Sequence, residues 1–326
     1  MVVRQHWLQH PLTHRGPVTQ PMGRCRGGSH FLISTGTIAM TSELNLHEFS
    51  IANLTVGGGD PVALIEAAGY SGFGAVGLVL QTAMNKPLSH EIIGRPEVIR
   101  AIKAASKAAG VKVFDVEAFV LRPGIDAASF IPALETGAEL GATHISSIGT
   151  EIVDNDMFLS ESERIDLFSE LCEEAARFGL HVGVEFMRYR DIPDLTAALA
   201  LLEAAGNSNA GVILDVLHFH RTGGTPQQIA GCPASRIAYV QLCDAGPAVP
   251  RLEDLPAEAR GARLHLGDGV IPLDAILDVL PSGLQMVIET PVASEATLSL
   301  KEKVDSAAEH IKRFAAWRAS PSSATA

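Results

Sequence analysis

The 326-residue chain has few cysteines, few charged residues and fewer basic than acidic side chains. Its four cysteines are scattered without a Cys-x-x-Cys pair, which argues against a disulfide framework or a structural zinc site and is typical of reduced cytoplasmic thiols. Lysine and arginine number 25 against 37 aspartates and glutamates, a net charge of −12 that argues against a nucleic-acid partner. No apolar run reaches the ~18 residues of a membrane helix, so no membrane partner is expected.

Hydrophobic residues make up 47% of the chain, enough to bury a sizeable core. The first forty residues differ from the rest, because they contain four arginines and no acidic residue. Their prolines and paired glycines would break the amphipathic helix of an organelle address. We therefore expect residues 1–42 to be a disordered or loosely ordered extension, or an over-long start that precedes a natural Met40. Residues 43–318 are expected to form a single domain, and residues 319–326 a disordered tail.

Strand-like and helix-like segments alternate eight times along this domain. Strands are expected at residues 47–53, 74–80, 111–120 and 143–148, at segments ending at residues 185, 215 and 241, and at residues 284–288. Helices are expected at residues 61–68, 95–109, 127–140, 160–179 and 193–205, in a short segment from residue 226, and at residues 273–280 and 298–317. The alternation over about 275 residues predicts a (β/α)8 TIM barrel of the α/β class. A doubly wound sheet is the alternative, but the VGGGD segment lacks the G-x-G-x-x-G spacing it would need.

The stretch VILDVLHFHRTGG, at residues 212–224, is the centre of the pattern. Its first three residues are continuously apolar, as expected of a strand covered on both faces, and Asp215 stands where that strand ends. A carboxylate buried there must be hydrogen-bonded, shifted in pKa or bound to a metal, because an unpaired buried charge is costly. For Asp215 alone, a structural role capping the next turn is the simpler interpretation.

The same pattern recurs in three further strands, which end near Glu185, Gln241 and Glu289. Glu185 precedes Asp215 by 30 residues and Gln241 follows it by 26, the spacing of repeated strand and helix units. Active sites of such barrels lie at the carboxyl ends of the strands, so we predict that these four side chains bind one metal ion. Three carboxylates and one amide oxygen favour Mn2+ or Mg2+ as the cofactor, with Co2+ or Zn2+ less favoured.

A divalent ion held in this way could bind a carbonyl and an adjacent hydroxyl of a small-molecule substrate. It would stabilise the enediolate that forms when a proton leaves the carbon between them. Glu185 and Glu289, on opposite sides of the ion, would serve as ligands and as proton carriers. His218, three residues after Asp215, is predicted to be a further catalytic and substrate-binding residue, although a surface imidazole is the alternative.

These residues lie in motifs that resemble the xylose isomerase-like TIM barrel superfamily, the sugar phosphate isomerase/epimerase group. The motifs are VEF at residues 184–186, LDVLH at 214–218, VQLCDA at 240–245, GDGVIPL at 267–273 and IET at 288–290. The resemblance implies metal binding by Glu185, Asp215, Gln241 and Glu289, proton transfer by Glu185 and Glu289, and substrate contact by His218. The group includes ketose 3-epimerases, inosose isomerases and dehydratases, and 3-dehydroshikimate dehydratases.

Two departures from the epimerases stand out. Their third ligand is usually a histidine, and Gln241 makes the chain more similar to the dehydroshikimate dehydratases at this point. A substrate-binding arginine that follows that ligand in the epimerases is replaced here by AGPAVP. Arg122, Arg251, Arg260 and Arg263 are therefore the candidates to hold a substrate carboxylate or phosphate by a bidentate contact, although most arginines are solvent-exposed.

We thus expect a divalent-metal-dependent isomerase or epimerase of a sugar, sugar phosphate, polyol or related hydroxy-ketone. A dehydratase of the 3-dehydroshikimate or inosose type is the enzymatic alternative, since it needs the same metal and the same proton abstraction. A non-catalytic barrel subunit or binding protein is the alternative from another class. A cytoplasmic location is expected. The sequence leaves the oligomeric state open, with a homodimer as one candidate because barrels of this kind often pair.

Overall fold

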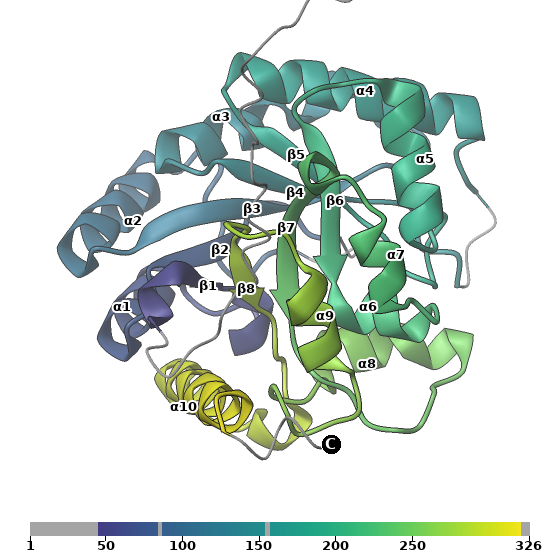
Figure 1. The fold of residues 1–326 in the computed structure, drawn as a ribbon. Coiled ribbons are helices and arrows are strands. Elements are labelled where there is room, and N and C mark those ends of the chain that lie inside the picture. Colours follow the sequence, from purple (N-terminus) through teal and green to yellow (C-terminus); the bar gives the residue numbers. More distant parts are fainter. Residues whose placement is uncertain (1–44, 84–86, 154–156, 321–326) are drawn as a thin grey trace, which may run out of the picture. The chain divides into compact units, whose positions relative to one another are not determined.

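A computed structural model describes residues 45–83, 87–153 and 157–320. Within these ranges eight parallel strands pair in sequence order, and the first also pairs with the last, so that the sheet closes into a barrel (Figure 1). Helices between the strands surround it, which confirms the predicted (β/α)8 TIM barrel. The extension expected at residues 1–42 and most of the expected tail lie outside the described residues.

The strands carry the candidate site at their carboxyl ends. They are β1 (Phe49–Ile51), β2 (Ala75–Val79), β3 (Lys112–Val120), β4 (His144–Ile148), β5 (His181–Glu185), β6 (Ala210–Asp215), β7 (Ile237–Leu242) and β8 (Met286–Ile288). The helices are α1 (Pro61–Ser71), α2 (Pro96–Ala109), α3 (Ile131–Leu140), α4 (Glu161–Arg177), α5 (Leu195–Ala205), α6 (Val216–Arg221), α7 (Pro226–Ala230), α8 (Leu255–Gly261), α9 (Leu273–Val279) and α10 (Leu300–Arg318). Short 3-10 turns lie at Leu46–Glu48, Asn53–Val56, Ala127–Phe130, Ala234–Arg236, Leu252–Asp254 and Ala293–Glu295.

Most of these elements agree with the sequence pattern. Helix α4 begins with the expected capping box, in which Ser160 and Glu163 bond each other's backbone N–H groups. The helix expected at residues 127–140 is divided into a 3-10 turn and α3. Two short helices, α6 and α8, were not expected, and both supply side chains to the candidate site.

Alternate residues along the strands pack on opposite sides of the sheet. In β6, Val212 and Leu214 belong to the large core between strands and helices, whereas Ile213 joins a small cluster that also contains Tyr239 and Val287. This is the pattern of a closed barrel whose interior is filled by side chains from several strands. No helix in the described parts of the chain is long and apolar enough to cross a membrane.

One carboxyl group is buried next to this interior cluster. Asp115, in β3, accepts a hydrogen bond of 3.3 Å from the hydroxyl of Tyr239. Gly77 makes room for it, because a Cβ at that position would lie 2.7 Å from Asp115 Oδ1. Burial raises the pKa of Asp115 to about 7, so its carboxyl group can keep a proton up to neutral pH.

The variant Asp115→Asn should therefore be more stable than the wild type in alkaline solution. The folded-state pKa of about 7 lies above the ordinary value of 3.8, so the stability that the protonated group contributes below pH 4 is lost as the pH rises through 7. Asparagine has no such loss, and the variant should gain on the order of 3 kcal/mol over the wild type between pH 4 and pH 9. Urea unfolding at both pH values measures this gain, and a pH-independent difference would contradict it.

Candidate metal centre

The closed barrel brings the four predicted ligands to one end. Glu185 is the last residue of β5, Asp215 is the last residue of β6, and Glu289 directly follows β8. Gln241, in β7, is the register partner of Asp215 in the neighbouring strand. All four side chains are buried, so this end of the barrel concentrates three carboxyl groups and one amide away from water.

Asp215 also begins the unexpected helix α6. Its Oδ1 accepts hydrogen bonds from the backbone N–H groups of Leu217, at 2.7 Å, and His218, at 3.1 Å. The structural capping role is therefore present, and it fixes His218 within the first turn after the strand. The imidazole of His218 packs edge-on against Tyr189, with 5.8 Å between ring centroids, and its Nε2 lies 3.5 Å from Glu185 Oε1.

Glu185, Asp215 and His218 form a group that can hold a metal ion, with one ligand atom from each within 4.8 Å of the others. Two atoms nearby are buried without a hydrogen-bond partner among the described residues, namely Gln241 Oε1 and His218 Nε2. Buried polar atoms of this kind cost free energy unless something binds them. A divalent cation would be a partner for Gln241 Oε1, and His218 Nε2 could meet either the cation or a bound substrate.

Burial and neighbouring charges set the protonation of this group. Burial raises the pKa of Glu185 well above its usual value, and the charges of Glu289 and Asp215 act in the same direction. Burial also raises the pKa of Glu289 to about 8, although Arg263 opposes this. For Asp215 burial is the largest single influence and acts to raise the pKa, but the charge and hydrogen bond of Arg263 together with the contributions of His218 outweigh it, so the pKa is lowered. Burial lowers the pKa of His218 to about 4, so this imidazole is neutral at pH 7.

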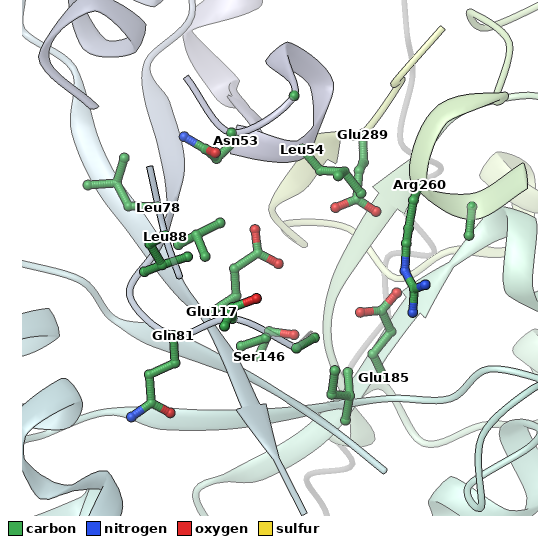
Figure 2. Close-up of a pocket in the computed structure, with 18 of the residues that line it drawn as sticks. Asn53, Leu54, Leu78, Gln81, Leu88, Glu117, Ser146, Glu185, Arg260 and Glu289 are labelled. Atoms are coloured by element: carbon green, nitrogen blue, oxygen red, sulfur yellow. The ribbon is translucent and has the colours of Figure 1, made fainter. Parts of the chain in front are cut away.

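A cavity of about 370 Å3 opens onto the centre. Figure 2 shows the carboxylates of Glu117, Glu185 and Glu289 and the guanidinium of Arg260 pointing into the same space. Glu117, in β3, was not anticipated from the sequence, although the acids at positions 115 and 117 in an otherwise apolar strand were a usable signal. Burial raises the pKa of Glu117 well above its usual range.

The candidate arginines lie in different places. Arg260 and Arg263 line the cavity, and Arg263 binds two of the predicted ligands. Arg122 is exposed and does not line the cavity, and Arg251 is exposed beside Glu253 and Asp254. No contact among the described residues supports a role of Arg122 or Arg251 in substrate binding.

Arg190 is a further arginine of the cavity wall that the sequence did not single out. Its guanidinium donates to the carbonyl of Gly149 at 2.7 Å and lies 3.5 Å from Glu151 Oε2, and the same carboxylate binds Arg260. Both guanidinium groups lie near the ring of Tyr189, at 5.7 Å and 6.0 Å from its centroid. This side of the cavity is therefore positively charged, and Glu151 holds the two arginines together.

The motifs VQLCDA and GDGVIPL have a shared structural role. The carboxylate of Asp244 accepts hydrogen bonds from the backbone N–H groups of Ala245, Gly267, Gly269 and Ile271, at 2.8 to 3.1 Å. Gly269 cannot carry a side chain, because a Cβ there would lie 2.2 Å from the carbonyl oxygen of Ala245. Asp244 thus fixes the loop between α8 and α9 against the end of β7.

The sequence matches the family of xylose isomerase-like TIM barrels over residues 62–314, and the chain belongs to this family. It is 26% identical to an inosose isomerase of Halalkalibacterium halodurans over 153 residues, which are 45% of this chain and 51% of that protein. It is 36% identical to a 3-dehydroshikimate dehydratase of Pseudomonas aeruginosa over 81 residues, which are 24% of this chain and 13% of that protein. The chain thus spans about half the length, or less, of these curated relatives.

Comparison with solved structures finds the same barrel fold. A crystal structure of the IOLI protein with a binding zinc atom superposes with a TM-score of 0.68 and 16% sequence identity. The superposition covers 83% of this chain and 98% of that protein. At this identity the likeness shows the shared fold alone.

Two isosteric variants should separate ligands from other acids of the cavity. Glu185→Gln removes a charged ligand and should weaken Mn2+ binding by about 100-fold or more, because even supporting contacts to ligands are worth roughly 10- to 100-fold. Glu117→Gln is the matched comparison, since Glu117 lies in the same cavity outside the metal-binding group, and its affinity should fall by less than about tenfold because a nearby charge but no ligand is lost. Isothermal titration with Mn2+ measures both, and equal losses would contradict the assignment.

Proposed function

We propose that the chain is a divalent-metal-dependent isomerase or epimerase of a small polyhydroxylated carbonyl compound. The observation that carries this proposal is the convergence of Glu185 and Glu289 on one cavity beside a group that can hold a metal ion. Membership in the xylose isomerase-like family and the match to an inosose isomerase support it. Mn2+ or Mg2+ is the cation that we propose for this oxygen-rich site.

The residues of the chain divide the work between binding and proton transfer. Glu185, Asp215, Gln241 and Glu289 would hold the cation, which supplies electrostatic stabilisation of the oxyanion that forms when a proton leaves the neighbouring carbon. Glu185 and Glu289 exchange that proton at their carboxylate oxygens. The pKa of Glu289, raised by burial to about 8, suits this role, since a group that titrates near neutral pH can both take up and return a proton, and burial raises the pKa of Glu185 in the same direction. Neutral His218 offers a hydrogen bond to the substrate.

A dehydratase is the second candidate, and the positively charged wall of the cavity favours it. Arg190 and Arg260 could bind a carboxylate at the end of the substrate opposite to the reacting carbon. A 3-dehydroshikimate dehydratase is also the curated relative with 36% identity over its matched segment. In such an enzyme the same proton abstraction is followed by loss of a β-hydroxyl group as water.

The first experiment is solvent exchange on metal-loaded protein. Metal-free enzyme reloaded with Mn2+ is incubated in D2O with inosose, with ketohexoses and with 3-dehydroshikimate, and the products are followed by NMR. Deuterium at a carbon next to the carbonyl without loss of water is expected for the isomerase or epimerase, whereas elimination of water would establish the dehydratase. If no substrate exchanges and Mn2+ does not bind, both enzymatic proposals are contradicted, and the hypothesis of a non-catalytic barrel subunit or binding protein is the one that stands.

Substitution of Arg260 distinguishes the two candidates further. Arg260→Met should raise KM for 3-dehydroshikimate by about tenfold or more, because a charge-assisted hydrogen bond to the carboxylate is lost. KM for uncharged inosose should stay within about twofold, since no such bond is made. Arg251→Met, at an exposed arginine outside the cavity, is the control. A similar rise in KM for both substrates would mean that Arg260 shapes the cavity without recognising an anion.

A further inference from the structure

Arg263 is the buried cation of the metal centre. Its side chain is only 2% exposed, and its Nη1 lies 2.6 Å from Asp215 Oδ2 while its Nη2 lies 2.8 Å from Glu289 Oε2. Its Nε donates to the carbonyl oxygen of Ala259 at 2.8 Å, and its Nη1 also contacts Cys243 Sγ at 3.5 Å. One guanidinium therefore joins two of the predicted metal ligands, which come from β6 and from the end of β8.

The backbone on both sides of this arginine is held in place. Arg263 donates its own N–H to the carbonyl of Pro291 at 3.2 Å, and Leu264 exchanges two hydrogen bonds of 2.8 Å with Asp244. Asp244 in turn fixes the loop that comes after this segment. A side chain carried by such a fixed segment keeps its position, as a supporting residue of a metal site must.

These contacts use four of the five N–H donors of the guanidinium. Too few donors remain for the bidentate contact to a substrate anion that the sequence suggested for Arg263. Arg260, three residues earlier, has its guanidinium in the cavity and its ion pair with Glu151 outside the ligand set. The two arginines of this segment therefore have separate tasks.

The positive charge of Arg263 balances part of the negative charge of the predicted ligand set. The three carboxylates of Glu185, Asp215 and Glu289 carry a charge of −3 when they bind a metal, and the amide of Gln241 adds none. Arg263 reduces this to −2, the charge that one divalent ion neutralises. A buried site with uncompensated charge is strongly unfavourable. The residual charge of the site therefore affects the free energy of unfolding of the metal-free protein and the preference of the site for a divalent or a trivalent ion.

We propose that Arg263 is a positioning residue that acts as a fixed counter-cation. It holds Asp215 and Glu289 in place in the absence of metal, and it matches the ligand set to a divalent rather than a trivalent ion. The inference rests on the metal site of the proposed function, but it concerns ion binding and stability and needs no knowledge of the substrate.

The test compares Tb3+ with Mn2+ in the full chain. Arg263→Met removes one positive charge, so the ratio of Tb3+ to Mn2+ affinity should rise on the order of tenfold or more, because the lost repulsion acts more strongly on the trivalent ion. Arg263→Lys keeps the charge and should leave the ratio within about threefold. Arg260→Met is the matched control, since it removes a cation from the same cavity wall outside the ligand set, and its ratio should also stay unchanged.

Two further measurements keep the test decisive if Arg263→Met folds poorly. Gln241→Glu adds one negative charge to the ligand set with Arg263 intact, and should shift the ratio in the same direction. Metal-free Arg263→Lys should keep a melting temperature closer to the wild type than metal-free Arg263→Gln, which should melt about 10 °C lower because two buried carboxylates lose their partner.

The outcomes separate this inference from the proposed function. Wild type that binds Mn2+, with a ratio unmoved by Arg263→Met and Gln241→Glu, would overturn the counter-cation and leave Arg263 a packing residue, while the proposed enzyme stands. Wild type that binds neither ion would overturn the metal site and the inference with it. If Arg263→Met keeps the wild-type ratio of Tb3+ to Mn2+ affinity and the wild-type exchange activity, the inference about Arg263 is overturned and the proposed function stands.

Discussion

Burial of several carboxyl groups at one end of a closed barrel is the constraint on which this structure depends. Glu185, Asp215 and Glu289 are each at most 4% exposed, and like charges at such short range oppose folding unless a cation or a proton compensates them. Within the described residues, Arg263 provides a fixed positive charge next to Asp215 and Glu289. The raised pKa values of Glu185 and Glu289 favour their protonated, uncharged forms. The groups that are proposed to serve catalysis, the buried carboxyl groups and Arg263, are thus also the groups whose charges must be balanced for the barrel to fold.

The barrel could be predicted from the sequence because most of its strands are short and largely apolar runs between polar turns. The two helices that were missed show where this reasoning fails. Helix α6 starts directly at the end of β6, so Val216 and Leu217 extend the apolar run of the strand with no turn residue between them. Only the two N–H groups bonded by Asp215 mark the change from strand to helix, and a side-chain cap inside an apolar run is invisible to periodicity.

The candidate site was predictable where position along the chain decides position in space. Residues at the ends of parallel strands must meet at one end of the barrel, and Glu185, Asp215, Gln241 and Glu289 lie at that end. The acids and histidine close enough to hold one metal ion are Glu185, Asp215 and His218, and Glu289 is not among them. The partners of the arginines were not predictable, since Arg260 and Arg263 are three residues apart with identical side chains. The turn after α8 directs one guanidinium into the cavity and the other into the ligand set, which only the folded backbone decides.

The proposed chemistry also has two parts, one that depends on the strand ends and one that depends on the cavity wall. Under the proposed function, proton transfer next to a carbonyl would use the carboxyl groups at the strand ends, and an isomerase, an epimerase or a dehydratase would each begin with that step. The step after proton transfer depends on how the rest of the substrate is held, because a β-hydroxyl leaves only when its bond is aligned with the developing enediolate. In this chain Arg190, Arg260 and Glu117 line the cavity outside the ligand set. Under the proposed function, the cavity wall would therefore decide between isomerisation and dehydration, and the metal centre alone would not.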